Sequence, residues 1–156
     1  MYNEQRFRDF IVEAKRATYA GYGKETESSR IKSRDLPYEK GDLKYLDSYL
    51  GESQFIGEEV VWYNDEPIWG MNYYGTLIDE PFEGFGDFLK SALRLVTPEA
   101  PYRGPKYFCK DEMEYICSWE GDITFFEGRE EIRFKGKPVY RLVFHGGKIR
   151  ELSSRI

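Results

Sequence analysis

The chain begins with an amphipathic helical pattern, and a similar pattern returns about half-way along the sequence. In both places core-type residues recur at spacings of three and four, which predicts a helix with one buried face. The two sets are Phe7, Phe10, Ile11, Ala14 and Thr18, and Phe85, Phe88, Leu89, Ala92, Leu93 and Val96. The motif AGYG follows the first set and TPEAP follows the second. Both helices are expected to end there, because glycine relaxes the backbone and proline cannot continue a helix.

After each predicted helix the pattern changes to a period of two. Alternation between apolar and polar residues is typical of a strand with one buried face. The alternating segments are 43–50, 54–63, 67–77, 112–119, 125–134 and 138–145. Within each group of three, the short links NDEP and KGKP join the last two segments. Links this short predict antiparallel hairpins.

The two halves of the chain are similar in sequence. FIGEEVVWYNDEPIWGMNYYG (55–75) aligns with FEGREEIRFKGKPVYRLVFHG (126–146) at a constant offset of 71. Upstream, Tyr45, Ser48, Tyr49 and Gly51 align with Tyr115, Ser118, Trp119 and Gly121 at an offset of 70. We therefore expect one α+β domain over 1–156 with an internal duplication of an α-β-β-β unit, the repeats spanning about 4–78 and 82–150. The expected architecture is an antiparallel sheet of about six strands with two helices on one face.

Composition excludes several classes of protein. The 156 residues are 40% hydrophobic and 17% aromatic, which is too apolar for a disordered chain. No apolar run is long enough to span a bilayer, and the polar start MYNEQRFRDF is unlike an export signal, so we expect a cytoplasmic protein without a membrane partner. With 23 Lys+Arg against 28 Asp+Glu and no basic stripe, we expect no direct binding of nucleic acid.

The alternation places two glutamates on the protected face of the sheet. In 126–134 the charged residues Glu127, Arg129, Glu131 and Arg133 share one face, so Glu130 lies on the other, and Glu59 is its aligned counterpart. The same parity surrounds them with rings and apolar residues. These are Phe55, Tyr63, Trp69, Met71 and Tyr73 in the first half, and Phe126, Phe134, Tyr140 and Phe144 in the second. A buried carboxylate costs several kcal/mol unless it is paired, hydrogen-bonded or protonated.

Three explanations for these glutamates are open. In the first they are structural, accepting hydrogen bonds from tyrosine hydroxyls, Arg16, Arg94 or nearby backbone amides. In the second they form a cleft for a cationic or amine-bearing small molecule, with attraction between the cation and aromatic faces. This second explanation is the function that we expect, and its ligand site would comprise Glu59, Glu130, Tyr63, Trp69, Tyr73 and Tyr140. In the third the pair acts as acid and base in a hydrolase.

The outward face of the first half is unusually apolar. Ile56, Val60, Trp62 and Tyr74 stand where a solvent-facing sheet would carry charge. Either a second layer, such as the long polar segment 19–42, or a partner chain would cover them. A homodimer interface at Trp62 and Tyr74 is one expectation.

Signals for metals, cofactors and standard catalytic motifs are weak. Cys109 and Cys117 fit no paired metal knuckle, and His145 is the single histidine. The sequence has no GxxxxGK[ST], GxGxxG or GxSxG motif. We expect no metal, no cofactor and no catalytic residues of those types.

Four segments carry a family resemblance: FIGEEVVWY, PIWGMNYYG, SWEGD and FHGG. Together they resemble an uncharacterised prokaryotic domain family of unknown function, found alone or C-terminal to Xre-type helix-turn-helix regulators. The resemblance covers nearly the whole chain and implies an effector-sensing module. One N-terminal helix is too little for a helix-turn-helix bundle, so DNA binding does not carry over.

Overall fold

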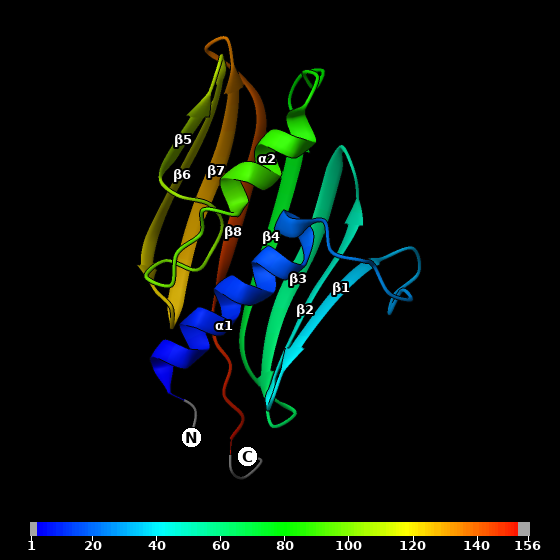
Figure 1. Ribbon diagram of the computed structural model, residues 1–156, viewed down its shortest axis with the longest axis vertical. Coiled ribbons are helices and arrows are strands. Elements are labelled where there is room, and N and C mark those ends of the chain that lie inside the picture. The colour runs from blue at the N-terminus through cyan, green and yellow to red at the C-terminus, as the bar shows by residue number, and fades with distance from the viewer. Residues whose placement is uncertain (1–2, 153–156) are drawn as a thin grey trace.

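The computed structural model describes residues 3–152 and consists mainly of one antiparallel sheet (Figure 1). The elements in chain order are α1 (Glu4–Ala17), a 3-10 turn η1 (Tyr19–Gly21), β1 (Arg34–Lys40), β2 (Leu43–Gly51), β3 (Gln54–Tyr63), β4 (Glu66–Leu77), α2 (Phe85–Leu93), β5 (Tyr107–Lys110), β6 (Met113–Asp122), β7 (Phe125–Phe134) and β8 (Lys137–Lys148). The strand order is β1-β2-β3-β4-β8-β7-β6-β5. No helix among residues 3–152 is long and apolar enough to cross a membrane.

The expected six-stranded α+β fold is wrong, because the sheet has eight strands and the two helices are short. The strands that the alternation did not reveal are β1 and β5, which form the two edges. An edge strand pairs on one side alone, so it tolerates a proline such as Pro37 and a short, irregular pattern such as YFCK. The six alternating segments correspond to β2, β3, β4, β6, β7 and β8.

The sheet joins its two halves at β4 and β8, the last strand of each. In this pairing Tyr73 lies opposite Phe144, its own counterpart in the sequence alignment. Met71 lies opposite Gly146, and Gly75 lies opposite Leu142. In the sequence alignment Met71 corresponds to Leu142, and Gly75 corresponds to Gly146, so each of these two pairs is the counterpart of the other. The register is therefore symmetric about the pair formed by Tyr73 and Phe144.

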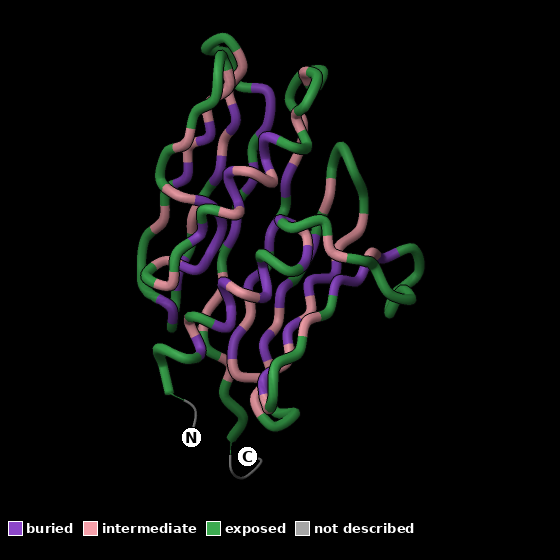
Figure 2. Tube along the Cα trace, in the orientation of Figure 1, coloured by how far each residue is buried: buried purple, intermediate pink, exposed green. Residues whose placement is uncertain are grey.

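The core lies between the sheet and the helices, which cross in front of it in Figure 1. Figure 2 shows the buried residues along the middle of the strands and on the helices, with exposed residues at the hairpin tips. The side chain of Asn3 caps α1 by accepting a hydrogen bond from the backbone amide of Arg6 at 3.1 Å.

Two aligned glycines make room for large rings on the inner face. A Cβ at Gly57 would lie 2.4 Å from the Tyr73 ring, and one at Gly128 would lie 2.3 Å from the Phe144 ring.

Candidate functional site

Glu59 on β3 and Glu130 on β7 are both buried, with 2% and 1% of their surface exposed. Each projects toward the helix-covered side of the sheet, where the alternation places it. Each also has its own internal cation, supplied by a different kind of element.

Glu59 is paired with Lys15 of α1. The Lys15 ammonium donates to Glu59 Oε1 at 2.7 Å and to the carbonyl oxygen of Tyr102 at 2.6 Å. The hydroxyl of Tyr45 donates to the same Glu59 oxygen. Lys15 reaches the core because it follows Ile11 by four residues, on the buried face of the helix.

Glu130 is held by a forked contact from Arg103, in the loop after α2. Arg103 Nε and Nη2 donate to Oε2 and Oε1 at 3.0 and 2.8 Å, and the hydroxyls of Tyr115 and Tyr140 each donate to one of these oxygens. Burial alone would raise the pKa of Glu130, but Arg103 and the two tyrosines hold that pKa below its ordinary value. Each carboxylate oxygen accepts two hydrogen bonds, which leaves the group poorly placed for acid or base chemistry.

The arginines suggested by the sequence as partners for the glutamates have other roles. Arg16 donates to the carbonyl oxygens of Arg94 and Val96 at 3.0 Å each. Arg94 donates to the carbonyl oxygen of Ala20 at 2.7 Å. Both therefore tie helix ends to neighbouring backbone.

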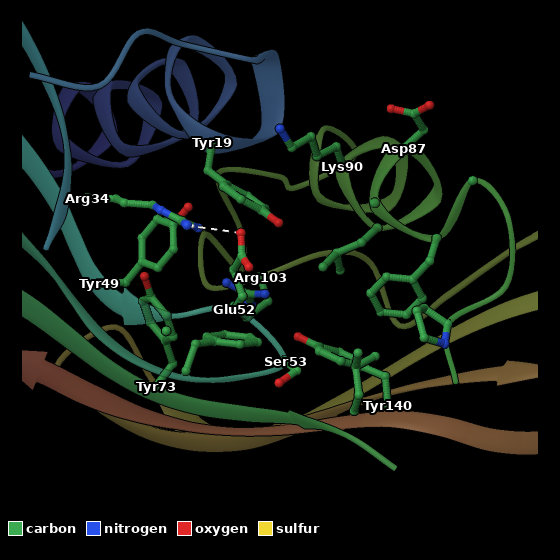
Figure 3. A pocket seen from close by; sticks show the side chains of 18 of the residues that line it. Tyr19, Arg34, Tyr49, Glu52, Ser53, Tyr73, Asp87, Lys90, Arg103 and Tyr140 are labelled. Carbon is green, nitrogen blue, oxygen red and sulfur yellow. Dashed lines mark hydrogen bonds and ion pairs between the residues drawn. The ribbon is translucent and has the colours of Figure 1, made fainter. Parts of the chain in front are cut away.

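A cavity of about 740 Å³ opens between the sheet, η1, the turn from β2 to β3 and the start of α2. Of the predicted ligand residues, Tyr73 and Tyr140 line this cavity, and neither glutamate does. Figure 3 shows Tyr19, Tyr49, Tyr73 and Tyr140 around it. The aromatic residues that line it are Tyr19, Tyr49, Phe55, Tyr73, Phe82, Phe85 and Tyr140.

Asp47 is a buried acidic residue of this cavity that the sequence interpretation missed. It is 6% exposed, and Tyr73 donates its hydroxyl to Asp47 Oδ1 at 2.5 Å. Burial and the nearby charge of Glu59 raise the pKa of Asp47 to about 7. Asp47 and Glu59 also border a void of about 20 Å³ that adjoins Lys15 and Arg103. The sequence could have indicated this position, because Asp47 lies two residues from both Tyr45 and Tyr49 and therefore shares their inward face of the strand.

The outer part of the cavity carries four charged residues, Arg34, Glu52, Asp87 and Lys90, of which Arg34 and Glu52 form an ion pair. Arg34 Nη2 donates to Glu52 at 2.9 Å, the contact drawn as a dashed line in Figure 3. The Lys90 ammonium lies 4.7 Å from the centre of the Tyr19 ring. The hydroxyl of Tyr22 donates to Asp87.

The remaining predicted site residues lie elsewhere. Trp69 is buried, donates its indole N–H to the carbonyl oxygen of Ile123 at 3.0 Å and stacks on Phe126. Tyr63 is half-buried at the end of β3. On the outer face Trp62 is half-buried and Tyr74 is 49% exposed. A homodimer through these two residues stays a prediction.

The long polar segment 19–42 does not form one continuous layer over the outer face. It starts with η1 beside the cavity and ends with the edge strand β1, and residues 29–33 between them contact Asp35 and Ser48 on the outward face. Ser33 donates to Asp35 Oδ1 at 2.8 Å, and Arg30 donates to the hydroxyl of Ser48 at 2.8 Å. These contacts cover one end of the outer face.

In the second half, the region that corresponds to the cavity is filled. Aligned with Tyr49, Phe55 and Tyr73 are Trp119, Phe126 and Phe144, and the ring of Tyr102 lies against all three. The centroid distances are 5.9 Å to Trp119, 4.2 Å to Phe126 and 6.3 Å to Phe144. Tyr49, Phe55 and Tyr73 thus border a cavity, whereas their counterparts in the second half are covered by Tyr102.

Residues 47–149 match the model of a family described as domain of unknown function (DUF5680). The chain belongs to this family. The matched range begins at Asp47 and includes Arg103, Tyr73 and Tyr140, so it contains most of the cavity floor. Neither the curated proteins nor the solved structures gave a match. Among the described residues, no cluster of three or more His, Cys, Asp or Glu side chains is arranged to hold a metal ion.

Proposed function

We propose that this DUF5680 domain binds a small molecule carrying a positively charged group, with Asp47 as the anionic contact. One observation carries the proposal: the buried charges around the cavity do not balance. Asp47, Glu59 and Glu130 supply three carboxylates, whereas Lys15 and Arg103 supply two cations.

Asp47 is the carboxylate left over from these pairs. Among the described residues, the hydrogen bond from Tyr73 is the one that its side chain accepts, and no ion pair includes it. A buried charge without a partner is costly, so the carboxyl group either holds a proton or faces a bound cation. The raised pKa of Asp47 expresses the same imbalance.

The cavity supplies the other half of a binding site. Its volume suits a small organic molecule. Arg34, Lys90 and Arg103 lie over the rings of Tyr49, Tyr19 and Tyr73. The other rings of the wall, which attract cations through their faces and have no such contact among the described residues, are Phe55, Phe82, Phe85 and Tyr140. Resemblance to domains found behind Xre-type regulators supports an effector-sensing role for such binding. Glu59 takes part indirectly, since its charge adds to the negative potential at Asp47.

The test compares n-hexylamine with 1-hexanol, which has a similar chain but no charge, by titration followed with NMR. We expect the amine to bind the native protein more tightly, and Asp47→Asn to weaken it by about tenfold, the loss of one charge-assisted hydrogen bond. Asp87→Asn is the matched control, because Asp87 also lines the cavity but is exposed. Equal binding of the amine to the native protein and to Asp47→Asn would refute the proposal.

A further inference from the structure

The second half of the sheet contains an aromatic side chain in the place that is open in the first half. Tyr102 stacks on Phe126 with ring centroids 4.2 Å apart and 25° between the planes. Its side chain belongs to the loop after α2, and the residue is 2% exposed. The second half therefore shows what this part of the fold accommodates when it is filled.

The surroundings of Tyr102 correspond closely to those of the cavity. Glu59 pairs with Asp47 across β2 and β3, as Glu130 pairs with Cys117 across β6 and β7. Gly57 lies opposite Tyr73, as Gly128 lies opposite Phe144. The register of the strands thus gives the same correspondence as the sequence offsets.

Ring contacts follow the same correspondence. Phe55 stacks with Tyr140 at 6.3 Å, and Phe126 stacks with Trp69, the counterpart of Tyr140, at 5.7 Å. Phe126 has a further ring partner, Tyr102, for which Phe55 has no equivalent among the ring contacts of residues 3–152. Phe55 is accordingly half-buried, whereas Phe126 is 1% exposed.

Tyr19 reproduces one contact of Tyr102, because it meets Tyr49 edge-on as Tyr102 meets Trp119, the counterpart of Tyr49. It comes from η1 and meets Tyr49 edge-on at 6.1 Å. Among the ring contacts of residues 3–152, those of Phe55 are with Tyr73 and Tyr140, both from the sheet. Phe55 itself lines the cavity.

We propose that the ligand carries an aromatic ring that stacks on Phe55 as Tyr102 stacks on Phe126. This inference rests on the proposed function, because the charged group of the same ligand contacts Asp47. Tyr73 connects the two contacts: its ring lies 6.0 Å from Phe55, and its hydroxyl lies 2.5 Å from Asp47. A short linker between ring and amine fits this spacing, so the ligand class is an arylalkylamine.

The experiment measures the dissociation constants of 2-phenylethylamine and 2-cyclohexylethylamine by NMR titration of the full chain. Both probes carry the amine, and one carries the aromatic ring. We expect the phenyl compound to bind about 2- to 10-fold more tightly, the range of an aromatic pair beyond simple burial. Phe55→Leu should remove this preference, whereas Phe85→Leu, another ring of the cavity wall, should retain it.

The outcomes separate the two proposals. Equal affinity for both amines, with both weakened by Asp47→Asn, would overturn the aromatic ring and leave the amine site intact. A phenyl preference that survives Phe55→Leu would likewise overturn the stacking contact. Binding of neither amine, with both variants folded by their NMR spectra, would overturn both proposals.

Discussion

The two halves of the sheet surround two different interiors with corresponding residues. In the second half Tyr102 fills the space beside Phe126, and Arg103 neutralises Glu130. In the first half the equivalent space beside Phe55 is open, and Asp47 stands where the second half has Cys117. One copy of the scaffold is closed and charge-balanced, and the other has a cavity and a surplus carboxylate.

This difference shows how a duplicated fold can combine one closed interior with one open interior. A closed, stacked interior contributes burial energy, whereas an unfilled cavity and a strained ionisation state cost stability and are typical of binding sites. Loops decide which copy is closed, since Tyr102 and Arg103 both come from the segment after α2. The strands themselves remain nearly equivalent.

The largest effect is expected from removing the cation of the closed half. Arg103→Met leaves Glu130 buried with two tyrosine hydroxyls and no positive partner, which should lower the free energy of unfolding by about 3–5 kcal/mol. Chemical denaturation measures this change. The double variant Arg103→Met/Glu130→Gln should recover most of the loss. A single variant as stable as the native protein would contradict the role given to this pair.

Removing the ring that fills the closed half should lower the free energy of unfolding by slightly less. Tyr102→Ala removes a buried ring from between Trp119, Phe126 and Phe144, and we expect a loss of about 3–4 kcal/mol. The variant should then have a second cavity, so p-cresol, the side chain that was removed, should raise its melting temperature more than that of the native protein. An equal rise in both proteins would show that the two halves do not differ as described.

The third prediction concerns the surplus carboxylate of the open half. The pKa of Asp47 is raised from 3.8 to about 7 on folding. Between those pH values the native state holds more protons than the unfolded state, so Asp47 makes the protein less stable as pH rises from 4 to 7. Asp47→Asn lacks this titration. Its stability relative to the native protein should therefore increase between pH 4 and pH 8 by a few kcal/mol, because each pKa unit of the shift is worth about 1.4 kcal/mol.

Denaturation curves of both proteins at several pH values test this prediction. Asp87→Asn serves as the control, because Asp87 is exposed and should show a much smaller change. A difference between Asp47→Asn and the native protein that stays constant from pH 4 to pH 8 would refute the raised pKa. In that case the charge of Asp47 would have to be balanced by a neighbouring cation and not by a bound proton.

The alternation of apolar and polar residues could predict the interior strands and the inward direction of Glu59 and Glu130. It could not predict β1 and β5, because each is an edge strand with one paired side and little constraint on its pattern. Arg103 could not be predicted as the partner of Glu130 either, because it lies in a loop and no periodicity determines where a loop side chain points. Lys15 and Asp47 were within reach. Each is a charged residue at a position whose period places it in the core.

The cavity itself has no signature in the sequence. Tyr49, Phe55 and Tyr73 have the same inward parity as Trp119, Phe126 and Phe144, yet one set lines a cavity and the other is covered. What distinguishes them is the ring that a distant loop places on one set. Such a contact depends on how the loop folds back over the sheet, which local propensity does not determine.

The symmetric register of β4 and β8 has a consequence for the origin of the chain. Because Tyr73 lies opposite its own counterpart Phe144, the seam has the geometry of an isologous dimer interface, in which each subunit presents the same patch. A half-length ancestor could have assembled this sheet from two identical copies. Joining the copies in one polypeptide would then have allowed them to diverge, one keeping an open cavity and the other being closed by Tyr102.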